Sequence, residues 1–434
     1  ELAHEKRTEF VNSVSSLLTE QQLNAFASEG RVQGRRLTNL QLERTLQDLL
    51  GVDIPLAELM SEEQRTAGFA TVAEGQSMSH FQLEQHLTVV DAALEEAFRR
   101  ATTPADETTI EFTAEEIART DTKRRCREPE MIGEDAVVWS SRLIFYGRLP
   151  ATTAAEDGWY RFTVRVSARK KPDEHGVWCT VRSGPCISSA PLLSWVDAFE
   201  AVDEPRELTF EAWLPKGHML EIRPGDTTLK MAKFQGGQVG VGEGEPQDVP
   251  GVNLHGLTMQ RIHRGPDDDA IRHWLFDDLQ IDLTSGDDAA RAKQPGQRSG
   301  QRGKGKQQVP AELNSEDAEV DLRRLIRRFA ERAFRSPVSQ TETQPYEDIA
   351  VGLSREGEPL LEALRAGYRA VLCSPRFMYF QESPGVLDEY ALASRLSYLL
   401  WNSMPDAELL SLAAEQQLSS GDVLRQQVDR MLRL

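Results

Sequence analysis

The sequence predicts an α+β protein of several domains, in which an antiparallel β-sandwich lies between a helical N-terminal domain and a C-terminal helical bundle. Three observations predict this organisation. The 434 residues exceed what one hydrophobic core usually serves. Apolar residues recur at helical spacing in residues 1–105 and 320–434, but alternate with polar ones between 108 and 266. Between the alternating region and the second helical region, residues 285–319 contain few apolar side chains.

The helical region 1–105 contains clear start and stop signals. Thr38 and Gln41 have the spacing of a capping box, and they precede a helical pattern that runs to Leu50. Gly51 then supplies a left-handed stop. The sequence therefore predicts a helix of about three turns that ends at this glycine.

Two more helices are expected in the same region. Ser79 and Gln82 form a second capping box ahead of residues 81–98, whose apolar side chains fall near helical spacing. Residues 16–27 are interpreted as part of an earlier helix pair, from a more mixed pattern. The apolar face of the second helix needs a helical partner.

Several short strands separated by turns are expected between 108 and 266. The Asp157-Gly158 pair before Trp159 is typical of a turn, as are Pro215-Lys216-Gly217 and Pro224-Gly225-Asp226. Serial short strands of this kind favour an antiparallel sandwich. The predicted strands cover residues 137–149, 159–168, 177–182, 208–214, 219–223 and 257–263.

Residues 285–319 are predicted to be a flexible linker. Between 291 and 306 the chain is rich in Gly, Gln, Lys and Arg and has no acidic residue. A charge run of this kind is more often a solvated tether than a phosphate-binding segment. We expect residues 290–310 to be cleaved first in limited proteolysis, because they cannot bury apolar area.

The last region, 320–434, again has helical spacing, and Ser-Pro pairs after two of its segments mark helix ends. The chain ends at Leu434 inside an amphipathic pattern, so this domain is expected to be truncated at its C-terminus. The expected helices cover residues 322–334, 359–373 and 388–401, with two more starting at Pro405-Asp406 and at Asp422.

Charge and hydropathy exclude two classes of partner. The formal net charge is −19, which disfavours nucleic acid because phosphate binding depends on clustered Lys and Arg. The sequence has no apolar run near the 18 to 20 residues, roughly, that a membrane span needs. The charged residues 1–7 do not begin like a signal peptide, and targeting information is expected to lie outside this sequence.

Four cysteines are too few and too scattered for a disulfide scaffold or a paired zinc site. Cys179 and Cys186 flank a short turn and are the one plausible disulfide pair. The alternative is that both are small buried hydrophobic residues, and the spacing does not decide between the two.

Searches for catalytic motifs fail. His80 and His86 lie six residues apart, so they lack the spacing of two zinc ligands on one helix face. The glycine-rich stretch 236–244 fits neither a dinucleotide loop nor a P-loop, and 75–79 fails the nucleophile-elbow pattern. No C-x-x-C-H haem-attachment motif is present. We expect no catalytic residue and no cofactor in this chain, which favours a non-enzymatic role.

Tryptophan provides the positive functional signal. Flat aromatic faces suit sugar rings, whose C–H groups stack on the π-system. The alternative is that these side chains form the core between two sheets, which is common in sandwiches. Trp178 and Trp195, next to turns, are the better candidates for exposure. Five of the seven tryptophans fall in the predicted sandwich: Trp139, Trp159, Trp178, Trp195 and Trp213.

Acidic residues near these two tryptophans complete the predicted ligand-binding set. Asp173, Glu174 and Asp197 could accept sugar hydroxyls or coordinate a calcium ion. The competing interpretation is that both tryptophans are buried and the acids are solvated turn residues. The identity of any bound metal is left open.

Three stretches of the chain resemble the large planctomycete proteins that are built from serial domains of unknown function, often fused to cytochrome c. The first starts at Arg35-Arg36-Leu37-Thr38 and ends at Gly51, with the later Gly68-Phe69. The others are residues 329–337 with 370–377, and 390–401 with Met404-Pro405-Asp406.

This resemblance implies export to the periplasm or cell surface and haem c in parts outside this sequence. It implies a non-catalytic binding or scaffold region, with a structural part of an extracytoplasmic oxidoreductase or electron-transfer protein as the alternative. Other domains of a longer protein are then partners. The central insert also resembles carbohydrate-binding modules of the jelly-roll, galactose-binding-like type, in residues 157–162, 214–223 and 257–266. That second resemblance implies a polysaccharide ligand.

Overall fold

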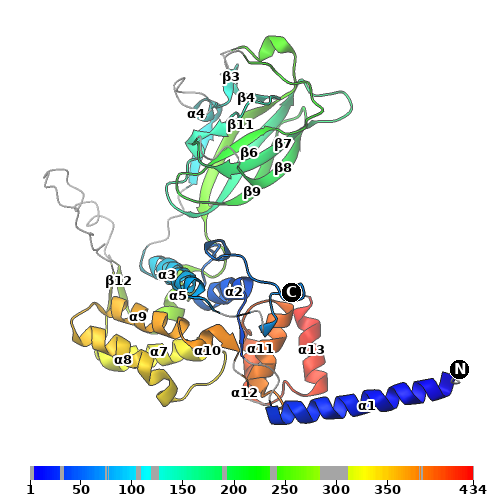
Figure 1. The fold of residues 1–434 in the computed structure, drawn as a ribbon. Coiled ribbons are helices and arrows are strands. Elements are labelled where there is room, and N and C mark those ends of the chain that lie inside the picture. The colour runs from blue at the N-terminus through cyan, green and yellow to red at the C-terminus, as the bar shows by residue number, and fades with distance from the viewer. Residues whose placement is uncertain are drawn as a thin grey trace. The chain divides into compact units, whose positions relative to one another are not determined.

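The computed structural model describes residues 4–29, 34–73, 76, 78–103, 109–118, 127–187, 193–234, 242–283, 311–380, 382 and 385–433. The chain divides into two compact units (Figure 1). The sandwich unit comprises Asp106–Arg264, and the helical unit comprises Glu1–Ala105 together with Gly265–Leu434. Among the described residues, no helix is both long and apolar enough to cross a membrane.

The sandwich unit consists of antiparallel strands, as the alternating pattern predicts. The predicted strand over 137–149 is wrong in its middle, because the chain turns between β4 and β5. Phe145 and Gly147 adopt positive φ angles there, which extended strands do not tolerate. The described strands are β2 (Thr109–Thr113), β3 (Glu130–Ile132), β4 (Asp135–Trp139), β5 (Arg148–Leu149), β6 (Gly158–Arg169), β7 (Val177–Gly184), β8 (Ser194–Ala201), β9 (Arg206–Leu214), β10 (Met219–Pro224) and β11 (Gly251–Ile262), and the short α-helix α4 covers Ala114–Ile117.

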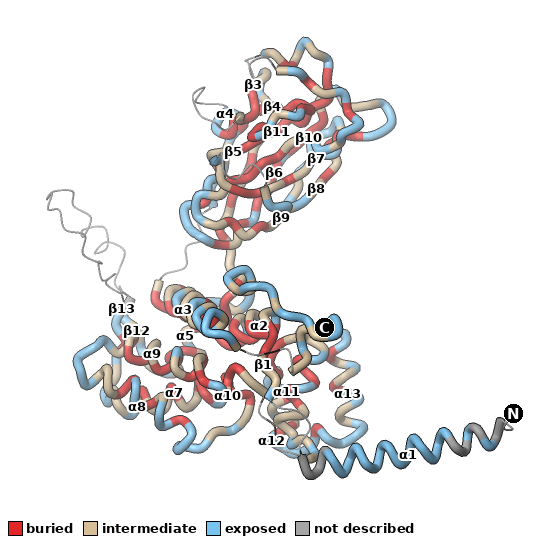
Figure 2. The backbone as a smooth tube through the Cα atoms, viewed as in Figure 1, coloured by how far each residue is buried: buried red, intermediate tan, exposed pale blue. Residues whose placement is uncertain are grey.

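These strands form two sheets that enclose one apolar core. The four-stranded sheet has the order β5-β10-β7-β8, and the larger sheet has the order β3-β4-β11-β6-β9, with β2 also paired to β11. Strand β6 is an interior strand of the larger sheet, and its burial alternates from Gly158 to Val166, with Phe162, Val164 and Val166 fully buried. Figure 2 shows this alternation of buried and exposed positions along the strands. The prediction of antiparallel sheets is confirmed, and the jelly-roll connection stays a prediction.

The helical unit contains the remaining helices and two short strand pairs. Strand β1 (Arg35–Arg36) pairs with β14 (Tyr379–Phe380), and β12 (Ile281–Leu283) pairs with β13 (Ala311–Leu313). The helices are α1 (His4–Glu29), α2 (Asn39–Leu50), α3 (His80–Thr102), α5 (Asp268–Phe276), α7 (Ala318–Phe334), α8 (Gln340–Arg355), α9 (Leu360–Leu372), α10 (Pro375–Met378), α11 (Glu389–Leu400), α12 (Ala407–Ala414) and α13 (Gly421–Met431).

The predicted helix signals are confirmed at α2 and α3. Thr38 and Gln41 form both hydrogen bonds of a capping box, and Ser79 and Gln82 do the same. Gly51 ends α2 at a φ of 71°. A Cβ at this glycine would also lie 2.8 Å from Cγ of Pro266, so both backbone conformation and packing require glycine here.

The structure corrects the division into separate N-terminal and C-terminal helical domains. Buried residues of α2, α3, α5, α7, α9 and α10 belong to one continuous apolar cluster. Arg100 on α3 joins the two parts of the chain, because it donates to Asp268 (2.9 Å) and to the carbonyls of Gly51 (2.9 Å) and Pro266 (2.8 Å). The apolar face of α3 therefore finds its partners in residues far along the chain. Helices α11, α12 and α13 enclose a smaller cluster of their own.

Three further sequence predictions have different outcomes. The predicted linker 285–319 is wrong at its end, because β13 and the start of α7 are regular structure that pairs or packs within the helical unit. The proteolysis prediction concerns residues outside the described part of the chain. Residues 16–27 are helical, within α1, and the described side chains from 11 to 25 are exposed (Figure 2).

The cysteine pairing is also corrected. Cys179 is a free thiol that is 1% exposed inside the sandwich core, so it does not pair with Cys186. Cys186 is itself disulfide-bonded. Burial places Cys179 with the inward-pointing side chains of β7, and burial also raises the pKa of its thiol.

Candidate functional site

The structure sorts the five sandwich tryptophans by exposure. Trp139 is fully buried, and Trp159 and Trp213 are half-buried. Trp178 and Trp195 are 48% and 61% exposed. The expectation that these two tryptophans are exposed is therefore confirmed.

Trp178 faces solvent because β7 alternates between the core and the surface. Its inward side chains are apolar or small, and the residues between them point to the outer face of the four-stranded sheet. The inward set is Val177, Cys179 and Val181, and the outward set is Trp178, Thr180 and Arg182.

Trp195 reaches the same outer face from the neighbouring strand. It is the direct cross-strand partner of Arg182, while Trp178 lies opposite Glu200. Directly opposed residues of antiparallel strands point to the same side of a sheet. A β-bulge between Val181 and Arg182 sets this register. We call this surface the aromatic face: Trp178, Thr180, Arg182, Trp195 and Glu200.

The two indoles are well separated along the aromatic face. Trp178 and Arg182, the partner of Trp195, are four positions apart on β7, which corresponds to about 13 Å at the usual rise of a strand. A ligand that touches both rings must therefore be elongated. Thr180 lies between the two positions along β7, and Arg182 lies beside Trp195.

Thr180 and Arg182 were not among the residues predicted from the sequence, although the alternation of β7 could have found them. The Oγ1 atom of Thr180 is buried and has no hydrogen-bond partner. The side chain of Arg182 makes no hydrogen bond or ion pair with the residues that the structure describes. The next side chain on this face, Arg223 of β10, is instead occupied, since it donates to the carbonyl of Leu143 (2.8 Å). Burial lowers the pKa of Arg223.

The predicted acidic residues lie at different places. Asp173 and Glu174 are exposed in the loop before β7, near Trp178, and Asp197 lies on β8 near Trp195. Asp197 accepts a hydrogen bond from the backbone N–H of Ala198 at 2.7 Å. Within the described parts of the chain, these three carboxylates do not form a group close enough to share a metal ion. Calcium binding stays a prediction.

The remaining tryptophans have structural partners. Trp159 and Trp213 form a cross-strand, edge-to-face pair with ring centres 6.0 Å apart on the other sheet. The guanidinium of Arg264 lies 3.4 Å from the ring centre of Trp159. Glu211 accepts from Arg264 (2.7 Å) and Arg161 (2.8 Å), and these hydrogen bonds lower the pKa of Glu211. This pair is already covered by protein groups.

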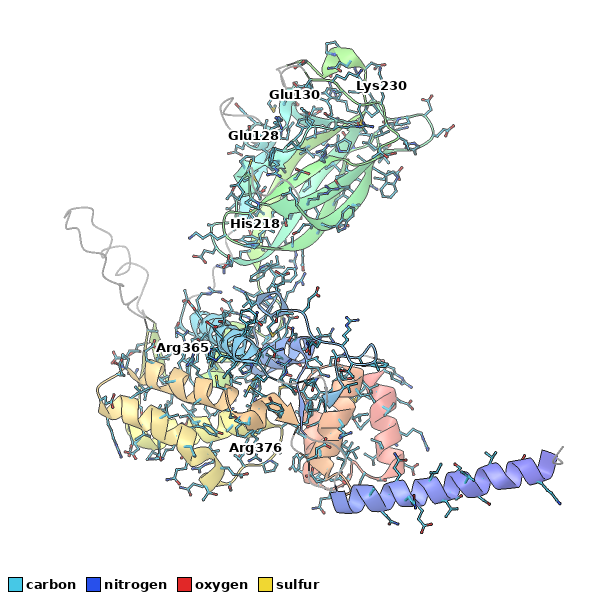
Figure 3. The ribbon with its side chains drawn as sticks, in the orientation of Figure 1. Glu128, Glu130, His218, Lys230, Arg365 and Arg376 are labelled. Atoms are coloured by element: carbon cyan, nitrogen blue, oxygen red, sulfur yellow. The ribbon has the colours of Figure 1, made fainter. Side chains whose placement is uncertain are left out.

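Trp139 is held by buried polar groups. Its indole N–H donates to Glu130, and its backbone N–H donates to the hydroxyl of Tyr146 at 3.0 Å. The other carboxylate oxygen of Glu130 accepts from the N–H of Gly242 at 2.9 Å. Figure 3 labels Glu130 and its neighbour Glu128, which are 4% and 2% exposed. Trp139 is therefore a core residue.

A serine, a histidine and an aspartate also lie in series on the larger sheet. Nδ1 of His255 is 2.7 Å from Asp135, and Nε2 is 3.0 Å from Oγ of Ser167. This order resembles a hydrolytic triad. Ser167 is only 3% exposed, however, and its hydroxyl also accepts from Asn253 at 3.0 Å. The chain of hydrogen bonds therefore links β4, β11 and β6 rather than presenting a nucleophile.

Comparisons with solved structures give distant matches. One is the apo form of the BiXyn10A module CBM1, with 14% identity, 36% of this chain and 100% of that chain covered, and a TM-score of 0.21. Another is a mutant of CBM29-2, a family 29 carbohydrate-binding module, with 11% identity, coverage of 38% and 91%, and a TM-score of 0.22. A third is Eiger TNF from S. frugiperda, with 8% identity, coverage of 38% and 97%, and a TM-score of 0.21.

A search of curated proteins returns no match. Family models match three segments of the helical unit. Residues 35–99 match PSD3, a protein of unknown function (DUF1587); residues 321–382 match PSD5 (DUF1595), and residues 387–434 match PSD4 (DUF1592), with the same description. The chain thus carries, in series, three segments similar to domains of unknown function.

Proposed function

We propose that the sandwich unit binds polysaccharide on its aromatic face, with Trp178 and Trp195 stacking on sugar rings. The observation that carries the proposal is the exposure of two indoles, 48% and 61%, on one side of one sheet. Large exposed aromatic side chains on a regular surface mark interaction sites more often than isolated exposed residues do.

A polar group beside the rings supports a hydroxyl-rich ligand. Arg182 offers up to five N–H donors without a described side-chain partner. Sugar hydroxyls can pair with this guanidinium while the ring faces contact the indoles. The separation of the two tryptophans favours an extended glycan over a single sugar.

A glycan array followed by affinity electrophoresis tests this proposal. We expect Trp178→Ala and Trp195→Ala each to weaken binding about tenfold, as for other central aromatic anchors, and the double variant to abolish it. Phe81→Ala is the matched control, since Phe81 is 58% exposed but lies in the helical unit. Equal retardation of wild type and the double variant, or no glycan bound by the folded wild type, would exclude the aromatic face as a glycan site.

We further propose that this chain is a non-catalytic region of an exported protein, in the periplasm or at the cell surface, that is associated with haem c. The disulfide at Cys186 supports an oxidising compartment, where such bonds persist. The exposed glycan-binding face fits the same location. Cell fractionation and a stain for covalent haem on the intact gene product test both parts. A cytoplasmic product without haem would overturn them.

A further inference from the structure

A cavity of about 690 Å³ lies in the helical unit, where β1, the start of α2, β14 and α11 meet. This volume is in the range of small-molecule sites. Among its lining residues are Arg35, Gln41, Phe380, Glu382, Arg395 and Tyr398. A second cavity, about 410 Å³, shares Phe380 and Glu382 with it.

The cavity is built where all three family-matched segments converge. Arg35 comes from the segment 35–99, Phe380 from 321–382, and Tyr398 from 387–434. The antiparallel pairing of β1 with β14 places Arg35 directly opposite Phe380. The site therefore requires residues of all three segments, and none of the segments could form it alone.

The charges in the cavity do not balance. Arg395 is neutralised by Glu382, which accepts from its Nε at 2.6 Å. Arg35 has no carboxylate within 4.0 Å among the described residues, and its one side-chain acceptor is the neutral amide of Gln41, at 3.0 Å. Its guanidinium lies 4.4 Å from the ring centre of Phe380. Arg35 is thus a half-buried cation with no described carboxylate in direct contact, and among carboxylates only the more distant Glu382 and Glu63 favour its charge.

A cation in such a place is unfavourable without an anion. Burial and the nearby Arg395 lower the pKa of Arg35, so both disfavour the charged form of this side chain. A carboxylate offers two oxygens that match the planar fork of a guanidinium. An anionic ligand would therefore stabilise the site.

The other walls suit a ligand with both flat and polar parts. Phe380 and Tyr398 meet edge to face, with ring centres 4.8 Å apart. The Tyr398 hydroxyl is fixed by Thr45 (2.7 Å) and Arg335 (3.3 Å). The amide of Gln41 lies beside that of Asn402, at 3.4 Å. The wall is thus held rigidly before any ligand enters.

We propose that this cavity binds a small carboxylate ligand and that Arg35 takes the carboxylate group. The ligand can be a sugar acid or a simple aliphatic acid, since both carry the same anionic group. The proposal is independent of glycan binding by the aromatic face.

Calorimetry on the full chain tests the proposal, in a background with Trp178→Ala and Trp195→Ala so that the aromatic face does not contribute. The probes are D-glucuronate, succinate, D-glucose and inorganic phosphate. We expect glucuronate or succinate to bind at least about tenfold more tightly than glucose. Glucuronate above succinate assigns a sugar acid, and the reverse order assigns an aliphatic acid. Equal binding of glucuronate and glucose, no binding of either acid, or binding of phosphate alone would overturn the proposal.

Two variants test the charge argument in opposite directions. Arg35→Gln should weaken carboxylate binding at least about tenfold, because it removes the free cation. Glu382→Gln should strengthen it at least about threefold, because it frees Arg395. Arg425→Gln, a 77% exposed arginine outside the cavity, is the control and should leave affinity unchanged. If Arg35→Gln fails to fold, the gain expected from Glu382→Gln still decides: unchanged or weaker binding in that variant refutes the assignment.

Discussion

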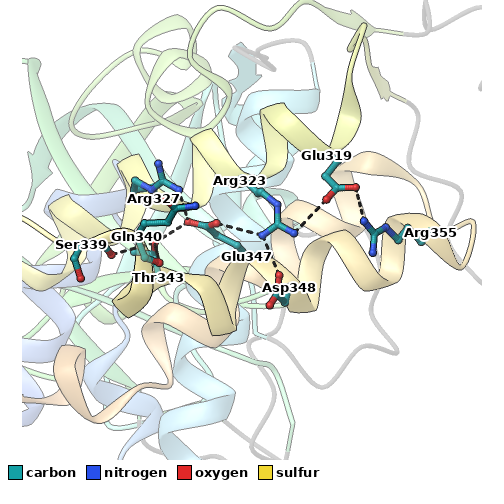
Figure 4. Close-up of polar contacts among 9 residues, drawn as sticks. All are labelled: Glu319, Arg323, Arg327, Ser339, Gln340, Thr343, Glu347, Asp348 and Arg355. Carbon is teal, nitrogen blue, oxygen red and sulfur yellow. Dashed lines mark hydrogen bonds and ion pairs between the residues drawn. The ribbon is translucent and has the colours of Figure 1, made fainter.

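Replacing Glu347 by glutamine should destabilise the helical unit, because this carboxylate is the buried centre of an ion network between α7 and α8 (Figure 4). Glu347 is fully buried. It accepts a hydrogen bond from Thr343 at 2.6 Å and pairs with Arg327 (3.1 Å) and Arg323 (3.4 Å). Glutamine keeps the shape and the bond to Thr343 but removes the charge.

The size of the expected loss of stability depends on which acidic partners each arginine retains in the Glu347→Gln variant. Arg323 retains Asp348 (2.9 Å) and Glu319 (3.2 Å), so its charge stays compensated. Arg327 has no other acidic partner among the described residues, and its buried Nε is already unpaired. Breaking a fully buried pair costs about 3–5 kcal/mol. Because the arginine side chains are 29% and 35% exposed and water can reach them, we expect a loss of about 2 kcal/mol for Glu347→Gln.

Urea unfolding followed by far-ultraviolet circular dichroism measures this loss, since the helical signal reports the helical unit. Asp348→Asn is the control: its side chain is 51% exposed on the same arginine, and we expect a loss below about 0.5 kcal/mol. A double-mutant cycle with Arg327→Gln should show coupling of about 1 kcal/mol. If Glu347→Gln costs no more than Asp348→Asn, the buried network does not stabilise the α7–α8 contact.

Two other predictions concern titrating groups. Hydrogen bonds from the backbone N–H and hydroxyl of Ser339 lower the pKa of Glu342 from 4.5 to about 2, so its stabilisation is present above pH 4.5 and is lost as the pH falls toward 2. The effect of Glu342→Gln on urea unfolding should be about 0.5 kcal/mol at pH 6 and vanish near pH 2; a constant difference would contradict the capping role. Burial raises the pKa of Cys373 to about 11 and also raises that of Cys179, so a thiol reagent at pH 8 should label neither in the native protein and both in urea. Rapid native labelling of Cys179 would show that the sandwich core is not closed over it.

The sequence predicted correctly the features that depend on interactions between residues close together in the chain. The capping boxes at Thr38 and Ser79 and the stop at Gly51 depend on residues within one helical turn, and all three are found. The exposure of Trp178 follows from period-two alternation, which is a property of the strand itself. Helix α8 was not predicted from the sequence, because Pro345 lies inside it and proline is unfavourable in a helix interior. In the structure, the packing of α8 against α7 outweighs this cost.

Edge strands and the disulfide were harder to predict. Strand β8 was missed because it lies at the edge of its sheet, where one bulge and weak burial blur the alternation. The proposed Cys179–Cys186 bond was wrong because sequence spacing does not give side-chain direction. Cys179 points into the core from β7, and the strand ends at Gly184, so Cys186 follows beyond it.

The sequence by itself determined the helical and alternating periods, the caps and the net acidic charge, and it indicated Trp178 and Trp195 as the better candidates for exposure. Only the tertiary structure decided that residues 1–105 and 265–434 share one core, and that Arg35 lines a cavity with no described carboxylate in contact with it. The physical reason is the distance along the chain over which each interaction acts. Periodicity and capping act over a few residues, whereas Arg35, Phe380 and Tyr398 come together only after helices distant in sequence have buried their apolar faces against one another.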